Sequence, residues 1–298
     1  MTGRVFLRAT SDDPPVAVEA HGATIVDAAG RRYLDAAGGA IVVGIGHGRA
    51  SVAAVMAEQA GRLAYAHGSV FTSEPLERYA AAVGLRLPLD DPAIYPVSGG
   101  SEGIETALKL ARAIVLARGE PDRTVVLARW GSYHGNTLGA LDLSGREPLR
   151  RPYEPWLGRF RHLSAAYPYR AGEVAAHALG STDALVAELE RTIAELGPGR
   201  IAAFVAEPIV GATLAYWPRL REICDRYGIL LISDEVFTGL GRTGRWFAVD
   251  HWGVRPDILV AAKGASSGYF PFGFAATSGE HYALVRRSGF THGFTFSH

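Results

Sequence analysis

The segment Ile229-Leu230-Leu231-Ile232-Ser233-Asp234 is the most informative part of the chain for its fold. It is an apolar run of strand length that ends on a carboxylate. Because successive residues are apolar, the run is typical of a strand buried on both faces, as in a parallel sheet. A carboxylate at such a strand end stays ionised only beside a cation or strong hydrogen-bond donors. Asp234 read alone is equally compatible with capping of the next turn.

Similar short apolar runs recur along the chain and alternate with amphipathic helical segments. The other runs cover residues 93–97, 124–128, 201–206 and 258–262, and the helical segments cover 51–63, 75–87, 102–118, 183–196 and 217–227. Residues 16–35 precede them as a small β-meander split by turn residues. This order predicts an α/β fold with a doubly wound, mostly parallel sheet flanked by helices.

In doubly wound sheets, ligands bind at the carboxyl ends of the strands. The polar residues expected at those ends are Ser98, Arg129, Glu207, Asp234 and Lys263. These side chains are therefore expected to converge at one edge of the sheet. A cofactor is expected to lie among them.

Lys263 is one of only two lysines in the chain, and it closes the apolar run 258–262. The other, Lys109, lies four residues after Glu105 on a polar helix stripe, as in an ordinary surface ion pair. An arginine could serve as a salt-bridge partner at position 263, but only a lysine can lose its proton near neutral pH and attack a carbonyl. Desolvation by apolar neighbours lowers the pKa of such a lysine enough for Schiff-base formation. The alternative is a lysine that snorkels at a strand end.

Residues 97–103 read Val-Ser-Gly-Gly-Ser-Glu-Gly and join a predicted strand to a predicted helix. Small residues at a helix N-terminus leave amide groups open to a phosphate. A tight turn with a serine cap explains the same residues equally well. No lysine follows the last glycine, so this is not a nucleoside-triphosphate loop.

Two other pattern matches fail on their context. Residues 239–244 match a dinucleotide glycine pattern, but Arg245-Trp246-Phe247 is a poor helix start. Residues 264–268 match a hydrolase nucleophile pattern, but Pro271 interrupts the helix that must follow. No metal site is expected from the histidines, because they lack metal-ligand spacing with cysteines or carboxylates. These histidines are His47, His134, His251, His292 and His298.

Bulk properties indicate a soluble globular protein. The 298 residues carry 30 basic and 30 acidic side chains, and 48% of residues are hydrophobic. The balanced charge indicates neither nucleic-acid nor membrane binding, so small molecules and other subunits are the expected partners. The single cysteine, Cys224, excludes an internal disulfide, and the N-terminus lacks the apolar core of a secretory signal. A cytoplasmic location is expected.

Residues 234–244, Asp-Glu-Val-Phe-Thr-Gly-Leu-Gly-Arg-Thr-Gly, together with Lys263-Gly264, resemble the signature of class III pyridoxal-phosphate aminotransferases. The segments 98–103, 133–137, 207–211 and 292–295 also resemble that family, in its order. The resemblance covers most of the chain from about Tyr33 onward. It implies the large domain of fold-type I enzymes, with pyridoxal 5'-phosphate as cofactor.

The resemblance also implies a role for each matching residue. Lys263 would form the Schiff base with the cofactor, and Asp234 would pair with the pyridine nitrogen. The remaining positions are implied cofactor contacts: Gly100 and Ser101 cradle the phosphate, Tyr133 stacks on the ring, Val236 packs on its other face, His134 and Glu207 line the site, and Thr295 reaches the phosphate of the neighbouring subunit. An active site shared by a homodimer follows.

The implied activity is transfer of an amino group from an amino acid or ω-amine to a 2-oxo acid through a Lys263 Schiff base. Decarboxylation, racemisation and aminomutase chemistry use the same cofactor residues and remain alternatives. The expected organisation is an N-terminal segment, residues 1–60, that contributes to the small domain, followed by the cofactor-binding large domain at 61–298. Compared with the family it resembles, the chain is expected to lack the C-terminal domain, so a catalytically idle remnant that binds the cofactor is the second hypothesis.

Overall fold

The computed structural model describes residues 4, 6, 14–167, 178–209 and 216–289. The chain divides into two compact units, Met1–Arg62 and Leu63–His298.

The first unit is built on an antiparallel meander. Its elements are β1 (Ala17–His21), β2 (Thr24–Asp27), β3 (Arg32–Leu34), α1 (Gly38–Ile41) and α2 (Ala50–Arg62). Asp27 holds the turn between β2 and β3, because its carboxylate accepts hydrogen bonds from the Ala29 amide, from the Arg31 amide and Nε, and from the Tyr33 hydroxyl. These donors lower the pKa of Asp27 to about 2.

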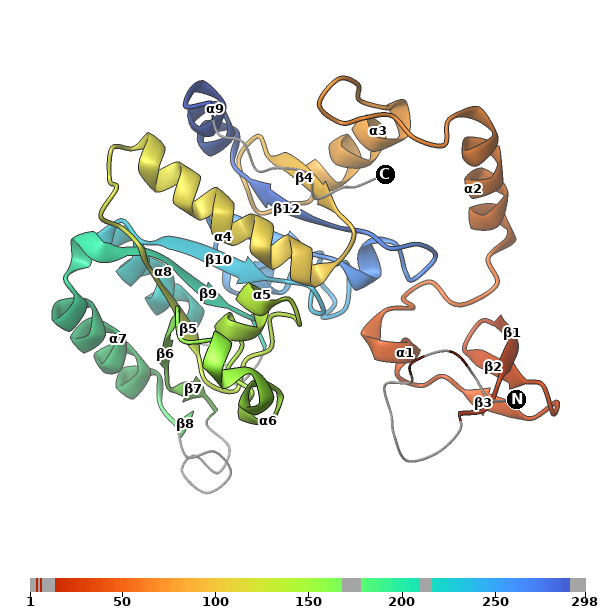
Figure 1. Cartoon of the computed structure of the whole chain (residues 1–298), viewed down its shortest axis with the longest axis horizontal. Coiled ribbons are helices and arrows are strands. Elements are labelled where there is room, and N and C mark those ends of the chain that lie inside the picture. Colours follow the sequence, from red (N-terminus) through yellow and green to blue (C-terminus); the bar gives the residue numbers. More distant parts are fainter. Residues whose placement is uncertain (1–3, 5, 7–13, 168–177, 210–215, 290–298) are drawn as a thin grey trace. The chain divides into compact units, whose positions relative to one another are not determined.

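The second unit contains a seven-stranded sheet in the order β4-β12-β11-β10-β9-β5-β6 (Figure 1). The strands are β4 (Ala93–Val97), β5 (Val125–Arg129), β6 (Arg161–Leu163), β9 (Ile201–Ala206), β10 (Leu230–Asp234), β11 (Ile258–Ala261) and β12 (Gly273–Thr277). β12 pairs antiparallel with both β11 and β4, and the other pairs are parallel. Six strands therefore share one direction, and their carboxyl ends lie at one edge.

Helices cover both faces of this sheet (Figure 1). The helices of the second unit are α3 (Glu74–Gly84), α4 (Gly100–Ala117), α5 (Leu138–Leu143), α6 (Glu147–Arg150), α7 (Thr182–Leu196), α8 (Tyr216–Tyr227) and α9 (Gly279–Arg287). Shorter elements are η1 (Arg151–Trp156), η2 (Pro198–Arg200), η3 (Ala248–Trp252), η4 (Lys263–Ala265) and the paired strands β7 (Ala165–Ala166) and β8 (Ala178–Leu179). No helix in the described ranges is long and apolar enough to cross a membrane.

The core forms two layers, because alternate residues of each strand point to opposite faces. On β10, Leu231 packs in the cluster that contains Leu220 of α8, whereas Leu230 and Ile232 pack in the cluster that contains Ile104 of α4. Every residue of β9, β10 and β11 is buried. Burial on both faces explains why these strands are apolar at successive positions.

The structure differs from the sequence-based expectation at one side of the sheet. The run 93–97 was expected to lie among parallel strands, but β4 pairs antiparallel with β12. β4 is an edge strand, which explains how it tolerates Pro96, a residue with no amide hydrogen for the ladder. β12 was not expected, because Gly273 and the two alanines of this strand carry little strand propensity. The helix α9 that follows it was not expected either.

Helix α4 packs closely against β11 through Gly103. A Cβ at this buried position would lie 2.6 Å from Val260 Cγ1. The Gly103→Ala variant should lower the free energy of unfolding by about 1–3 kcal/mol, because overpacking displaces the helix from the sheet. Urea denaturation followed by circular dichroism measures this change.

Gly61→Ala is the matched control. Gly61 lies in the exposed helix α2, and a Cβ there would meet no atom within 4 Å. This variant should be neutral or stabilising by up to about 1 kcal/mol, because alanine has the higher helix propensity. Equal denaturation midpoints for Gly103→Ala and the wild type would contradict the close packing of α4 on β11.

Candidate active site

The common strand direction brings the expected polar residues to one edge of the sheet. Asp234 is the last residue of β10, and Glu207 directly follows β9. Lys263 begins η4, two residues after the end of β11. The carboxyl ends of the neighbouring strands β9, β10 and β11 therefore lead to Glu207, Asp234 and Lys263, respectively.

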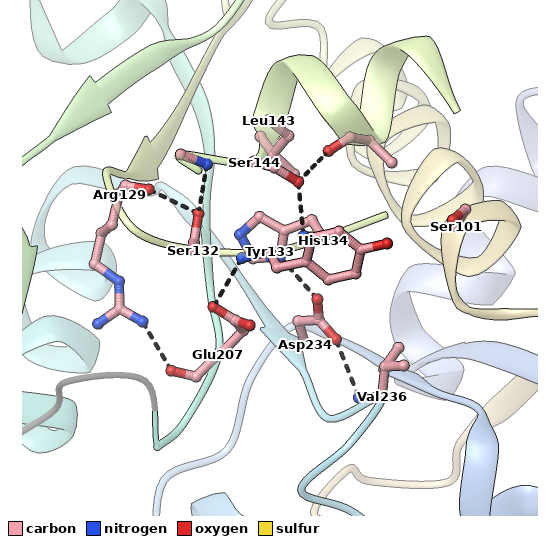
Figure 2. Close-up of polar contacts among 12 residues, drawn as sticks. Ser101, Arg129, Ser132, Tyr133, His134, Leu143, Ser144, Glu207, Asp234 and Val236 are labelled. Atoms are coloured by element: carbon pink, nitrogen blue, oxygen red, sulfur yellow. Dashed lines mark hydrogen bonds and ion pairs between the residues drawn. The ribbon is translucent and has the colours of Figure 1, made fainter. Parts of the chain in front are cut away.

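Asp234 is buried, with an exposed fraction of 2%, and each of its carboxylate oxygens accepts a hydrogen bond (Figure 2). His134 Nδ1 lies 2.7 Å from Asp234 Oδ2, and the Val236 amide donates to Oδ1 over 3.0 Å. These donors compensate for the loss of water around the charge. The buried Nε2 of the same His134 ring has no hydrogen-bond partner among the described residues.

The loop that carries Tyr133 and His134 is held by hydrogen bonds from its backbone (Figure 2). The His134 amide donates to Ser144 Oγ over 2.8 Å, and Ser144 Oγ donates to the Ala140 carbonyl over 2.7 Å. The Tyr133 amide donates to Glu207 Oε2 over 3.3 Å. The position of the His134 ring beside Asp234 therefore depends on tertiary contacts to α5 and to the end of β9.

The N-terminus of α4 lies beside this loop. Gly135 has a φ of +144°, and a Cβ there would overlap Ser101 Oγ. Ser101 Oγ in turn accepts a hydrogen bond from the Asn136 amide over 3.1 Å. The residue before α4 is Gly99, and no side chain caps the helix. The serine-capped turn considered from the sequence is therefore not formed, and the first amides of α4 have no intrahelical partner.

Gly100 brings the start of α4 against Val236. A Cβ at Gly100 would lie 2.9 Å from Val236 Cγ1, so the helix N-terminus and the residue two positions after Asp234 are in close contact. The segments 98–103 and 234–236 are distant in the sequence. Their contact places the α4 amides and the Asp234 carboxylate in one site.

Lys263 is partly buried and has an unusual backbone conformation. Its φ of +47° is in the left-handed region, which costs a residue with a side chain about 1–2 kcal/mol. Its Nζ lies 5.6 Å from the centroid of the Phe237 ring. Burial lowers the pKa of the Lys263 amine, and the charge of Arg146 lowers it further, whereas Asp234 and Glu207 act in the opposite direction. The amine is therefore more easily deprotonated than an exposed lysine.

Glu207 is buried, with an exposed fraction of 2%. Burial raises the pKa of its carboxyl group, the nearby His134 opposes this shift, and Asp234 adds to it. Arg129, also buried, donates from Nη2 to the backbone carbonyl of Glu207 over 2.8 Å. Arg129 therefore supports the main chain at the end of β9.

Some features of the site were not evident from the sequence. Ser144, Arg146 and Phe237 lie around the expected residues, but no pattern marks them as site residues. Thr295, expected to contact the phosphate of a neighbouring subunit, lies outside the described residues. Within the described ranges, no three His, Cys, Asp or Glu side chains group closely enough to hold a metal ion.

Comparison with known proteins places this arrangement in a protein family. The family model for aminotransferase class-III matches residues 8–298. The aminotransferase YodT of Bacillus subtilis is 41% identical over 89% of this chain and 61% of its own length. The putrescine–pyruvate aminotransferase of Pseudomonas aeruginosa is 34% identical over 95% of this chain and 63% of its own. The chain spans about three fifths of the length of these relatives.

Solved structures agree with this result. A thermostable (S)-enantioselective ω-transaminase from Thermomicrobium roseum superposes with a TM-score of 0.88 at 37% identity, covering 99% of this chain and 68% of its own. A PLP-bound amine transaminase from an uncultivated Pseudomonas species gives 0.87 at 35% identity, covering 99% and 70%. The expected α/β fold of the fold-type I large domain is confirmed, and the chain belongs to the class III aminotransferase family.

Proposed function

We propose that this chain is a pyridoxal-phosphate-dependent aminotransferase that transfers an amino group from an amino acid or ω-amine to a 2-oxo acid through a Schiff base on Lys263. The observation that carries the proposal is the pairing of the buried Asp234 carboxylate with His134, at the same sheet edge as the lysine with a lowered pKa. Family membership and the transaminase neighbours support the same reaction class.

The residues at this edge fit the proposed cofactor. The uncapped N-terminus of α4 offers the amides of Gly100 and Ser101 to a phosphate, and the helix dipole favours a negative charge there. The missing side chain of Gly100 allows these amides to lie against Val236. Asp234 presents a buried negative charge to a protonated ring nitrogen, and the Tyr133 and Val236 side chains would hold the two faces of the ring.

When bound, pyridoxal phosphate supplies an aldehyde that condenses with amines and a ring that accepts electron density from the substrate carbon. Lys263 Nζ would bind the aldehyde and, once displaced by the amino donor, would act as the general base at the substrate carbon. A neutral amine is needed for this role, and burial favours the neutral form of Lys263. Nζ would then return the proton on the cofactor side.

Asp234 and His134 would act as a pair. The Asp234 carboxylate would keep a proton on the ring nitrogen, because its negative charge stabilises the adjacent cation. His134 would hold the carboxylate in place through the 2.7 Å contact at Nδ1. Glu207 would line the substrate side of the site, and Thr295 of a second copy would complete the phosphate site in a homodimer. We place this dimer in the cytoplasm.

The Schiff-base assignment can be tested by chemical trapping. After incubation with pyridoxal phosphate and reduction with borohydride, peptide mapping should find a pyridoxyl group on Lys263, because reduction converts the imine to a stable amine. Lys109→Ala is a matched control, since Lys109 is the only other lysine of the chain. The adduct should persist in Lys109→Ala and be absent in Lys263→Ala. An adduct shared equally between the two lysines would contradict the assignment.

The role of Asp234 can be tested with Asp234→Asn, which keeps the shape and removes the charge. Turnover of a standard amino donor and pyruvate should fall by about 10²–10⁴-fold, because the ring nitrogen loses the group that keeps it protonated. Asp122→Asn removes an equal charge from an exposed position and should retain the wild-type rate. Unchanged turnover in Asp234→Asn, with an unchanged melting temperature, would exclude the proposed pairing.

A further inference from the structure

Arg146 places a cation at the edge of the candidate site. Its guanidinium carbon lies 5.4 Å from the centroid of the Tyr133 ring, over the ring face. The residue is exposed, and within the described part of the chain no carboxylate forms an ion pair with it. This distinguishes Arg146 from the nearby Arg150, which is buried and paired with Asp142.

The backbone directly before Arg146 is tightly fixed. The Gly145 amide donates to the Ser132 carbonyl over 3.0 Å, and the Gly131 amide donates to the Gly145 carbonyl over 2.9 Å. A Cβ at Gly145 would overlap the Arg129 carbonyl, so only glycine permits this approach. The residue that follows Gly145 is therefore held beside the loop that carries Tyr133.

The charges around Arg146 favour an anion from outside the chain. The contact with the Tyr133 ring places the Arg146 guanidinium beside the loop that leads to His134 and Asp234, and its charge acts to lower the pKa of the Lys263 amine. The acids of the site are committed elsewhere: Asp234 accepts from His134 and the Val236 amide, and burial raises the pKa of Glu207. A guanidinium offers two parallel donors, which match a carboxylate.

We propose that Arg146 is a specificity-determining residue that binds the carboxylate of the substrate, so that the site favours amino acids and 2-oxo acids over uncharged amines. This inference rests on the proposed aminotransferase function and specifies its substrate class. Tyr133 orients the guanidinium by stacking against it, and the backbone contacts of Gly145 fix its position. The reacting carbon of an amino acid lies next to its carboxylate, so a cation near Lys263 suits this class.

Binding of non-reacting probes tests the proposal directly. Isothermal titration of the chain loaded with pyridoxal phosphate should show that Arg146→Gln weakens binding of propionate by about tenfold to a hundredfold, as expected for a lost charge-assisted hydrogen bond. Propionamide, which has the same shape without the charge, should bind the variant and the wild type alike. Arg191→Gln, which removes an exposed arginine from α7, should bind propionate as the wild type does. Equal propionate affinity in Arg146→Gln and the wild type would overturn the proposal.

Kinetics separate substrate binding from an indirect effect on Tyr133. The ratio of kcat/KM for L-alanine to that for isopropylamine should fall by about tenfold or more in Arg146→Gln and recover in part in Arg146→Lys. An equal loss for both donors would mean that Arg146 only positions Tyr133, and would overturn the proposal. If the wild type formed no Lys263 adduct and used no donor, the aminotransferase function would fail, while propionate binding would still decide whether Arg146 holds a carboxylate.

The effect of the Arg146 charge on the Lys263 amine also gives a pH-dependent readout. Because the charge of Arg146 lowers the pKa of Lys263, its removal in Arg146→Gln should raise that pKa. At a fixed pH near 8, less of the amine is then neutral, and acetylation of Lys263 by acetic anhydride should be slower. Lys109 serves as the internal reference in the same sample. An unchanged rate ratio between the two lysines would show that Arg146 lies too far from the amine to hold a substrate carboxylate.

Discussion

Burial of the central strands on both faces is the constraint on which the rest of this structure depends. α4 covers one face of β9, β10 and β11, and α8 covers the other, so charged side chains are confined to the strand ends. Because these strands are parallel, their ends meet at one edge. Asp234 and Glu207 are thereby brought close to Lys263, although the three residues come from separate strands.

The chemistry proposed for this edge depends on opposing electrostatic effects. Desolvation lowers the pKa of Lys263, while the carboxylates of Asp234 and Glu207 raise it. His134 and the Val236 amide contact the two carboxylate oxygens of Asp234, so neither oxygen depends on Lys263 as a partner. Lys263 is thus left available for a reaction. In the inference drawn for Arg146, its positive charge both favours the neutral form of Lys263 and binds the substrate carboxylate.

Much of the fold could be predicted, because the strongest patterns come from the most deeply buried elements. The runs that became β9, β10 and β11 are apolar at successive positions, as a strand buried on both faces requires, and only the end of β10 carries polar residues. β12 was not predicted, because its alanines and glycine carry little strand preference. Its position depends on pairing with β4, which is distant in the sequence, and with β11. Likewise, Ser144 reaches the His134 amide only after the chain has folded back along α5.

The amino-acid sequence alone determined the fold class, the family and the positions of the lysine and the carboxylate, because these follow from local apolar runs and short motifs. Only the tertiary structure decided which groups surround them. The contacts of Asp234 with His134, of Gly100 with Val236 and of Arg146 with Tyr133 join segments separated in the sequence. Such contacts depend on how strands and helices pack in three dimensions, and no local pattern of residues encodes them.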